Sequence, residues 1–185
     1  MNEAAILGLE NEIIGLLGAK SVSADPRVRE RASIDGSPMS PIIAALLPLG
    51  VADLVATPAD AEQIAKAVAA ATRRGVPVTV RGKGTGNYGQ ALPLHNGLVI
   101  DTTRAKAIVE VGDGYVTAEA GTPMVLMEQA AWASGQALWM YPSTAQSTVG
   151  GFLSGGSGGT GSIDHGSNDQ GFVIALDVVH GDGSD

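Results

Sequence analysis

The chain has 185 residues, 44% of them hydrophobic and 16% charged, a balance that excludes a disordered protein and suffices for one core or two small lobes. The formal net charge of -8 is poorly suited to neutralising a phosphate backbone, so we expect no nucleic-acid partner. The chain contains no cysteine, which excludes disulfides, iron–sulfur clusters and thiolate metal sites. Redox chemistry would therefore need a bound organic cofactor.

The N-terminal fifty residues divide into a helical part and an irregular part. Residues 1–20 carry isoleucines and leucines interrupted by glutamates, which predicts an amphipathic helix rather than a signal peptide or a membrane span. We therefore expect a cytoplasmic protein with no integral membrane segment. Residues 33–48, rich in Ser, Pro and Gly, predict an irregular arm that wraps a surface, in which residues 42–47 are apolar enough to be buried.

A strand–helix–strand pattern follows the arm. Residues 51–56 form a short apolar strand, Thr57 and Pro58 resemble an N-cap and a first helical residue, and residues 59–74 form an Ala-rich helix that Gly75 ends. Residues 76–80 are a second strand. This order predicts two parallel strands that pair and are covered by one helix.

The remaining elements are short. We expect a strand at residues 98–101, a hairpin over 107–120 with its turn at 112–114, a helix from Thr122–Pro123 to about Ser134, and a last strand at 172–179. Residues 181–183 look like a further hairpin turn whose returning strand is missing, which predicts an incomplete chain.

The first glycine-rich loop, residues 81–89, directly follows the second strand and contains a literal GxGxxG from Gly84 to Gly89. The nicotinamide-binding fingerprint requires a helix to open at this loop, and the short distance to the next strand leaves no room for a crossover helix. A Walker motif also fails, because Gly84 follows Lys83. Glycines with positive φ let main-chain N–H groups converge on an anion, and Arg81 and Lys83 add positive charge, so we expect a pyrophosphate there rather than a plain surface turn.

The second glycine-rich loop spans residues 147–162. Its composition alone favours a flexible linker. However, Val149, Phe152 and Leu153 are suited to packing, and a backbone without side chains lets a large planar ligand approach closely. The two loops together predict a clasp around a flavin dinucleotide.

Five motifs, in one order, resemble the FAD-binding domain of the p-cresol methylhydroxylase and vanillyl-alcohol oxidase flavoproteins. They are residues 78–93, residues 96–101, Pro142–Ser143, Thr148–Gly151 and Ala175–Val179. The D-lactate dehydrogenase and glycolate oxidase flavoproteins are the most similar in character. The resemblance runs from about Val51 to the C-terminus and implies an α+β fold with a small βαβ lobe, part of a larger lobe with a mixed β-sheet and helices, and FAD between them.

The resemblance also implies which residues hold the cofactor. The backbone of the first loop would hold the pyrophosphate, through Arg81, Gly82, Lys83, Gly84, Thr85, Gly86, Asn87, Gly89 and Gln90. Residues of the second loop region would line the ribityl chain and the ring, namely Pro142, Ser143, Thr148, Gly150, Gly151, Ser154, Gly155 and Gly158. Val173 would offer its backbone to the adenine side. Many members link the flavin to a histidine where this chain has Thr85, so we expect FAD to be noncovalent.

Other polar and aromatic residues give no further site. His95, His165 and His180 are read as structural or solvated, no carboxylate spacing suggests a metal, and the large aromatic residues are expected to pack. Tyr88, Trp132, Trp139 and Tyr141 make up this aromatic group.

The sequence thus predicts the FAD-binding portion of an oxidoreductase that acts on a small hydroxy acid or alcohol, with the catalytic residues in a further C-terminal domain. We expect three parts, with residues 1–50 as helix and arm, 51–104 as the βαβ lobe and 105–185 as an incomplete second lobe. A homo-oligomer or the further domain is the expected partner. A nicotinamide-binding domain and a cofactor-free binding or assembly module remain the alternatives.

Overall fold

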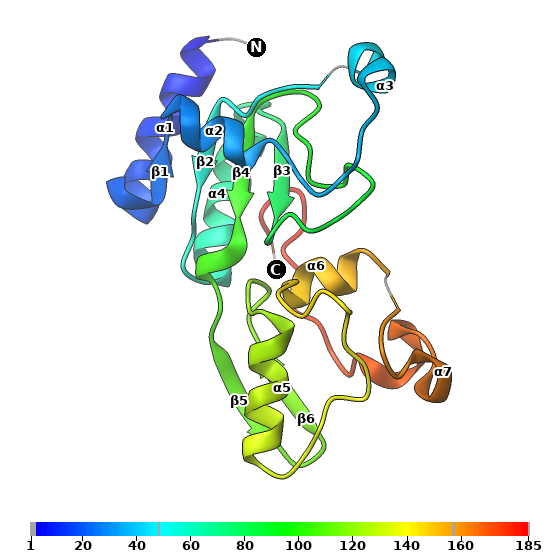
Figure 1. Ribbon diagram of the computed structural model, residues 1–185. Coiled ribbons are helices and arrows are strands. Elements are labelled where there is room, and N and C mark those ends of the chain that lie inside the picture. The colour runs from blue at the N-terminus through cyan, green and yellow to red at the C-terminus, as the bar shows by residue number, and fades with distance from the viewer. Residues whose placement is uncertain (1–2, 48, 157, 185) are drawn as a thin grey trace.

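The computed structural model describes residues 3–47, 49–156 and 158–184, and these residues form two lobes, shown one above the other in Figure 1. The helices are α1 (Glu3–Leu17), α2 (Pro26–Ala32), α3 (Pro41–Leu46), α4 (Ala61–Arg73), α5 (Met124–Ala133), α6 (Val149–Ser154) and α7 (Ser162–His165). The strands are β1 (Val22–Ser23), β2 (Leu54–Ala56), β3 (Val78–Arg81), β4 (Leu98–Asp101), β5 (Ile108–Gly112) and β6 (Tyr115–Ala118). Short turns of helix lie at Ala19–Ser21, Thr102–Arg104 and Asn168–Phe172.

The first lobe is built on a mixed four-stranded sheet in the order β1-β2-β4-β3. The expectation that β2 and β3 pair directly is wrong, because β4 lies between them and runs parallel to both. Val99 of β4 is level with Val55 on one side and Thr79 on the other. The physical reason is burial: Leu98, Val99 and Ile100 of β4 are all buried, as expected of a central strand that is hidden on both faces.

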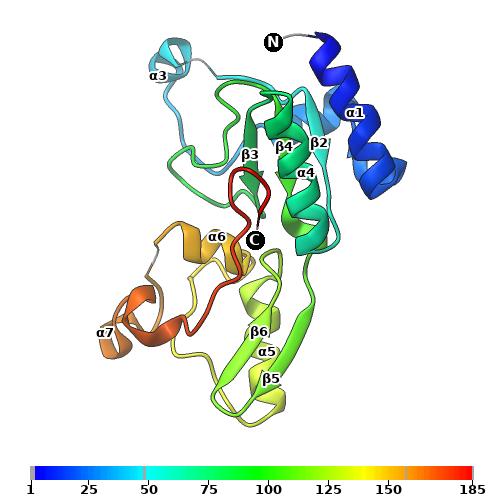
Figure 2. The same ribbon diagram turned by 180° about the vertical axis from the view of Figure 1, so that it is seen from behind.

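Helices cover the two faces of this sheet. Alternate residues of β2 and β4 point to opposite sides: Leu54 and Leu98 pack against α1 and α4, and Val55 and Val99 pack against α2. Figure 2 shows α4 and α1 on the near face. The predicted amphipathic N-terminal helix is confirmed as α1, which buries Leu9 and Ile13; residues 1 and 2 lie outside the described part of the chain.

The segment between α1 and β2 is more regular than expected. β1 pairs antiparallel with β2, and residues 26–32 form α2. Asp25 caps the N-terminus of α2, because its carboxylate accepts from the N–H of Arg27 at 2.9 Å. Within the predicted arm, α3 forms behind the cap Ser40. The expected burial of residues 42–47 is wrong: Ile42 is 74% exposed and Leu46 is 78% exposed, because no side chain of α3 joins a hydrophobic core of the described chain. Residue 48 of the arm lies outside the described residues.

The predicted caps are only partly correct. Gly75 has a φ of 63° and ends α4 as expected. Asp60, rather than Thr57, caps the N-terminus of α4, because its carboxylate accepts from the N–H of Gln63 at 2.8 Å while the Gln63 side chain accepts from Ala59 at 3.0 Å. At α5 the hydroxyl of Thr122 is likewise not a cap, since it donates to the carbonyl of Ala107.

The second lobe begins with the predicted hairpin. β5 and β6 are antiparallel, and the turn between them has Gly114 at a φ of 83°. The core below the hairpin is formed by Met124, Met127, Met140 and Phe152, from α5, from the segment after it and from α6. Glu128 is buried in this lobe, where its carboxylate accepts from the N–H of Leu138 at 2.8 Å and so holds that segment on α5.

The predicted strand at residues 172–179 is not formed. No strand of the described chain lies beside it, and an extended segment without a ladder partner has no regular main-chain hydrogen bonds to make it a strand. The expected turn is present, since the N–H of Gly183 donates to His180 and that of His180 to Ser184. This turn returns to the first lobe, where the hydroxyl of Thr72 donates to the carbonyl of Gly181 at 2.6 Å (Figure 2).

The predicted fold class is confirmed as two α+β lobes, with the mixed sheet in the first and an antiparallel pair in the second. α1 and β1 pack against other elements of the first lobe. The division at residues 50 and 104 stays a prediction.

Candidate cofactor site

The first glycine-rich loop leaves the end of β3 without starting a helix, as expected, and residues 82–97 reach β4 without any regular element. Gly84 and Gly89 have φ values of 67° and 77°, which only glycine adopts readily. In the described structure, no hydrogen bond uses the main-chain N–H groups of residues 83–87. A run of unused donors at the carboxyl end of a sheet is suited to binding an anion.

The two glycine-rich segments meet at one place. A Cβ atom on Gly82 would overlap the side chain of Thr148, so the two backbones approach as closely as a glycine allows. The hydroxyl groups of Thr85 and Ser147 are 2.8 Å apart. The start of the first loop therefore lies against the start of the second, beside α6 in Figure 1.

The charge expected from Arg81 is already used within the protein. Its guanidinium donates to the main-chain carbonyls of Ala32 at 2.6 Å and Ile34 at 2.9 Å, and lies where a Cβ on Gly84 would be. Lys83, in contrast, is exposed and forms no ion pair with another described residue. Lys83 is therefore the unpaired cation of this loop, and Arg81 supports the loop by binding the main-chain carbonyls of Ala32 and Ile34.

The second segment, expected to be a loop, is helical over Val149–Ser154. Thr148 caps it, with its hydroxyl oxygen accepting from the N–H of Gly151 at 3.3 Å. The N–H groups of Val149 and Gly150 donate to the carbonyls of Thr122 and Ala120, both at 2.8 Å. These donors are therefore used inside the lobe, and the glycines here serve the close approach of chains rather than an anion.

Gly150 shows that close approach directly. A Cβ there would lie 2.9 Å from the Cβ of Ala120. Gly151 is exposed, and a Cβ there would meet only the Thr148 hydroxyl at 3.1 Å. Thus Gly150 faces the lobe and Gly151 faces outward.

The rest of the second segment folds back on the chain that precedes it. Tyr141 and Thr160 form an antiparallel bridge, and a Cβ on Gly159 would overlap the carbonyl of Tyr141. Pro142 is buried beside this bridge, whereas Ser143 is exposed. The Pro142–Ser143 step and the end of the second segment are thus neighbours.

The other expected site residues are less closely tied to this place. Ser154 and Gly155 are exposed at the end of α6, and the Ser154 hydroxyl donates to Gly150. Gly158 is exposed near Ser162. The N–H of Val173 already donates to Asn168 at 3.3 Å. No described contact joins Val173 to the first loop.

Sequence patterns did not indicate the part that the N-terminal arm plays. A Cβ on Gly36 would lie 3.1 Å from the carbonyl oxygen of Gly86 and 3.3 Å from that of Thr85, so the arm lies directly on the first loop. One carboxylate oxygen of Asp35 is buried there without a hydrogen-bond partner. Main-chain carbonyls and a glycine in an irregular segment leave no recognisable pattern, which explains the omission.

The aromatic and histidine residues are mainly at the surface. Tyr88, Trp132 and Trp139 are more than half exposed, so the expectation that they pack inside is wrong for these three, because none of these side chains joins a hydrophobic core. Tyr141 does pack on the second core. His165 stacks on Trp139, with 5.4 Å between ring centroids.

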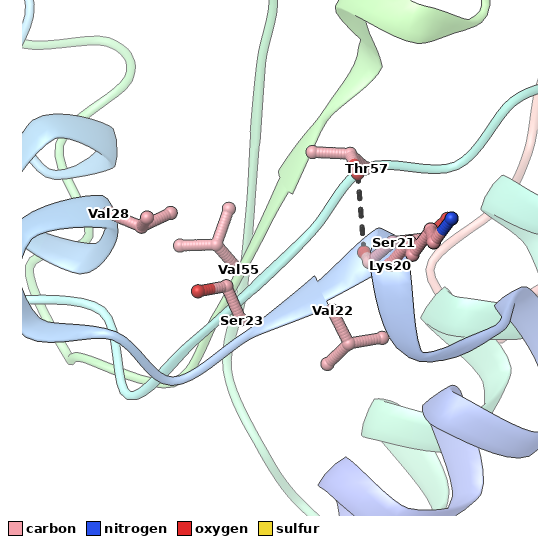
Figure 3. Close-up of a pocket in the computed structure, with 7 residues that line it drawn as sticks. All are labelled: Lys20, Ser21, Val22, Ser23, Val28, Val55 and Thr57. Atoms are coloured by element: carbon pink, nitrogen blue, oxygen red, sulfur yellow. Dashed lines mark hydrogen bonds between the residues drawn. The ribbon is translucent and has the colours of Figure 1, made fainter.

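Three further features of the described residues bear on ligands. No helix among them is long and apolar enough to cross a membrane, and no three of their acidic or histidine side chains gather as a metal site. A hollow of about 360 Å³ lies between α2 and the β1 edge of the sheet, lined by Val22, Val28 and Val55 among others (Figure 3). It is at the edge opposite β3, so it is separate from the glycine-rich loops.

The sequence profile of the family described as FAD binding domain matches residues 52–184. The chain belongs to this family. It is 28% identical over 131 residues to a D-lactate dehydrogenase of Archaeoglobus fulgidus, a match that covers 70% of this chain and 29% of that protein. It is 34% identical over 113 residues to an uncharacterised FAD-linked oxidoreductase of Mycobacterium tuberculosis, covering 60% of this chain and 25% of the relative. The chain thus matches less than a third of the length of these relatives.

Solved structures show the same fold. Alkyldihydroxyacetonephosphate synthase superposes with a TM-score of 0.77 at 19% identity, over 91% of this chain and 35% of the other. p-Cresol methylhydroxylase superposes with a TM-score of 0.67 at 14% identity, over 83% of this chain and 30% of the other. The resemblance inferred from the five motifs is confirmed, and FAD is the cofactor of the family.

The residues of the site fit a dinucleotide. The first loop offers unused N–H donors, positive-φ glycines and the free cation Lys83, all suited to a diphosphate. The contact of Gly82 with Thr148 brings the second lobe to the same place, as a ligand that spans two lobes requires.

Proposed function

We propose that the protein containing this chain is an FAD-dependent oxidoreductase that acts on a small hydroxy acid or alcohol. The chain supplies the part that holds the cofactor. When bound, FAD accepts a hydride or its equivalent from the substrate carbon. The observation that carries the proposal is the junction of the two glycine-rich segments at Gly82 and Thr148, in a chain of the FAD-binding family. The names of the D-lactate dehydrogenase and of a glycolate oxidase subunit from Bacillus subtilis, 26% identical, support the substrate class.

Within this proposal the main chain of residues 81–90 binds the diphosphate. Its N–H groups from residue 83 to residue 87 are unused donors, and Lys83 adds a positive charge that no described residue pairs. Pro142, Ser143 and the segment from Thr148 to Gly158 contact the ribityl chain and the ring, and Val173 lies toward the adenine. FAD is noncovalent because the first loop has no histidine and the chain no cysteine.

The side chains that abstract a proton from the substrate belong to a further domain in this proposal. The three histidines of the described chain are exposed, and none of them forms an ion pair with a described carboxylate. That domain or a second copy of the chain is the proposed partner. A cytoplasmic location stays a prediction from the N-terminal sequence.

A flavin titration tests the proposal. Purified protein is expected to quench added FAD fluorescence saturably and to release flavin on denaturation. Gly151→Val should weaken this binding without lowering the melting temperature much, because Gly151 is exposed and only the Thr148 hydroxyl lies near its Cβ position. Gly181→Ala, at a position with no atom within 4 Å of the added Cβ, is the matched control. Protein without bound flavin that also fails to bind added FAD would refute the proposal.

The same titration separates the alternatives. A nicotinamide-binding domain would bind NADH in preference to FAD, although the helix that its fingerprint requires is absent from residues 82–97. A cofactor-free module would bind neither.

A further inference from the structure

The side chain of Arg81 connects the cofactor loop to the N-terminal arm. Arg81 is the last residue of β3, directly before the first glycine-rich loop. Its guanidinium donates to the carbonyls of Ala32 at 2.6 Å, Ile34 at 2.9 Å and Arg31 at 3.3 Å. A guanidinium is a rigid fork of donors, so these bonds fix the chain at the end of α2 relative to the end of β3.

The arm makes a second, independent contact with the loop. Gly36 lies on the main chain of Thr85 and Gly86, where an added Cβ would be 3.1 Å from the carbonyl oxygen of Gly86. The bend that brings Gly36 there is held by Asp35, which accepts from the N–H of Ser37 at 2.9 Å and from its hydroxyl at 2.6 Å. In Figure 1 the arm descends beside the loop on the side away from α4.

The loop needs such support because it has little of its own. The N–H groups of residues 83–87 make no hydrogen bond within the described protein, so main-chain hydrogen bonds do not fix the conformation of this stretch. When a ligand must order a loop as it binds, the loss of conformational entropy lowers the binding affinity. A loop that is already fixed avoids this loss. The arm, which precedes the family match at residues 52–184, supplies this order from outside the FAD-binding domain.

We propose that Arg81 is a positioning residue that docks residues 32–36 on the FAD loop, so that arm docking and diphosphate binding strengthen each other. Only the second part of this proposal, the strengthening of diphosphate binding, rests on the proposed function. The coupling is reciprocal by thermodynamic necessity: if the arm raises the affinity for FAD, FAD must stabilise the docked arm. Arg81 therefore acts through the arm rather than by touching a phosphate.

Hydrogen exchange of the 185-residue chain tests the docking without any cofactor. Arg81→Met should increase amide exchange over residues 33–37, whereas Lys83→Met, which removes the same charge two residues further along the chain, should leave it unchanged. Arg81→Lys, which keeps a donor, should fall between the two. Equal exchange of the arm in the parent and in Arg81→Met would overturn the proposal. This result does not depend on whether FAD binds.

A double-mutant cycle tests the coupling to FAD. Arg81→Met and Gly36→Val, which pushes the arm off the loop, should each weaken FAD binding about tenfold, and the double variant should be no weaker than either alone. Lys83→Met with Gly36→Val should be additive, since Lys83 does not act through the arm. Added FAD should also slow arm exchange in the parent and not in Arg81→Met, an effect that a purely structural role would not produce.

Each result of the cycle has one meaning. Additive losses for Arg81→Met and Gly36→Val would show that Arg81 binds the diphosphate directly and would overturn the proposal. Absence of FAD binding by the parent would refute the proposed function instead, and the exchange comparison would still decide on the docking.

Discussion

Gly82, at the start of the first glycine-rich loop, lies so close to Thr148 that a methyl group on Gly82 would occupy the place of the threonine hydroxyl. Thr148 is also the cap of α6 and is buried. One contact therefore joins the strand that carries the proposed diphosphate loop to the helix that faces the proposed flavin.

Gly82→Ala is expected to destabilise the protein by about 1–3 kcal/mol, the usual cost of forcing an extra carbon into a close contact. It should also reduce FAD affinity, because the two lobes separate where they hold one ligand. Thr148→Ala removes the obstructing atoms but loses the cap, at a cost of about 1 kcal/mol. Urea denaturation should show the double variant to be more stable than the sum of the two losses predicts. Strict additivity would mean that these residues do not touch in solution.

Gly84→Val is expected to reduce FAD retention more than it reduces stability. Gly84 has a φ of 67°, which costs a valine about 1–2 kcal/mol, and its Cβ would displace the Arg81 guanidinium. Flavin absorbance per chain after desalting measures retention. Gly114→Val, at a φ of 83° with no atom within 4 Å, is the control with matched backbone strain on the distant hairpin. Retention equal to the parent in Gly84→Val would contradict the assigned loop.

Glu12→Gln should lower the free energy of unfolding by about 1 kcal/mol at low salt, and less at high salt. Glu12 on α1 forms ion pairs with Arg73, at 2.7 Å, and with Arg74 at the end of α4, and its side chain is only 25% exposed. Glu62→Gln removes an exposed pair with Lys66 within α4 and should change stability little. A salt-independent loss in Glu12→Gln would mean that packing rather than charge is responsible.

The stability of the β5–β6 hairpin should fall at alkaline pH. The hydrogen bond from the Tyr115 hydroxyl to Glu110, at 2.9 Å, together with the carboxylate charge, raises the pKa of Tyr115 above its ordinary value of 10.0. A raised pKa means that the contribution to stability is complete below pH 10.0 and is lost as the pH rises through the folded-state pKa. Ultraviolet titration should show a tyrosine whose pKa falls in Glu110→Gln. If the tyrosine titration is unchanged in Glu110→Gln, the Tyr115 hydroxyl is not hydrogen-bonded to Glu110 in solution.

Sequence patterns correctly predicted the features that depend on neighbouring residues in the chain. The glycines at positions 75, 84 and 114 have positive φ because only glycine adopts it cheaply, and each position could be read from its neighbours in the sequence. The absence of a helix after residue 84 followed in the same way from the short distance to the next strand. The order of five motifs was sufficient to indicate the family, which the profile match confirms.

The sequence by itself determined the FAD-binding family, the helix–strand order of the first lobe, and the loop suited to a diphosphate, because each depends on short motifs and on their order along the chain. Only the tertiary structure decided that β4 enters between β2 and β3, that residues 172–179 form no strand, and that Arg81 faces the arm rather than the ligand. These outcomes depend on which strand gains most from burial, on whether a ladder partner is present, and on carbonyl groups 47 to 50 residues away. Main-chain carbonyls are the same at every residue, so no side-chain pattern marks the ones that a distant arginine will bind.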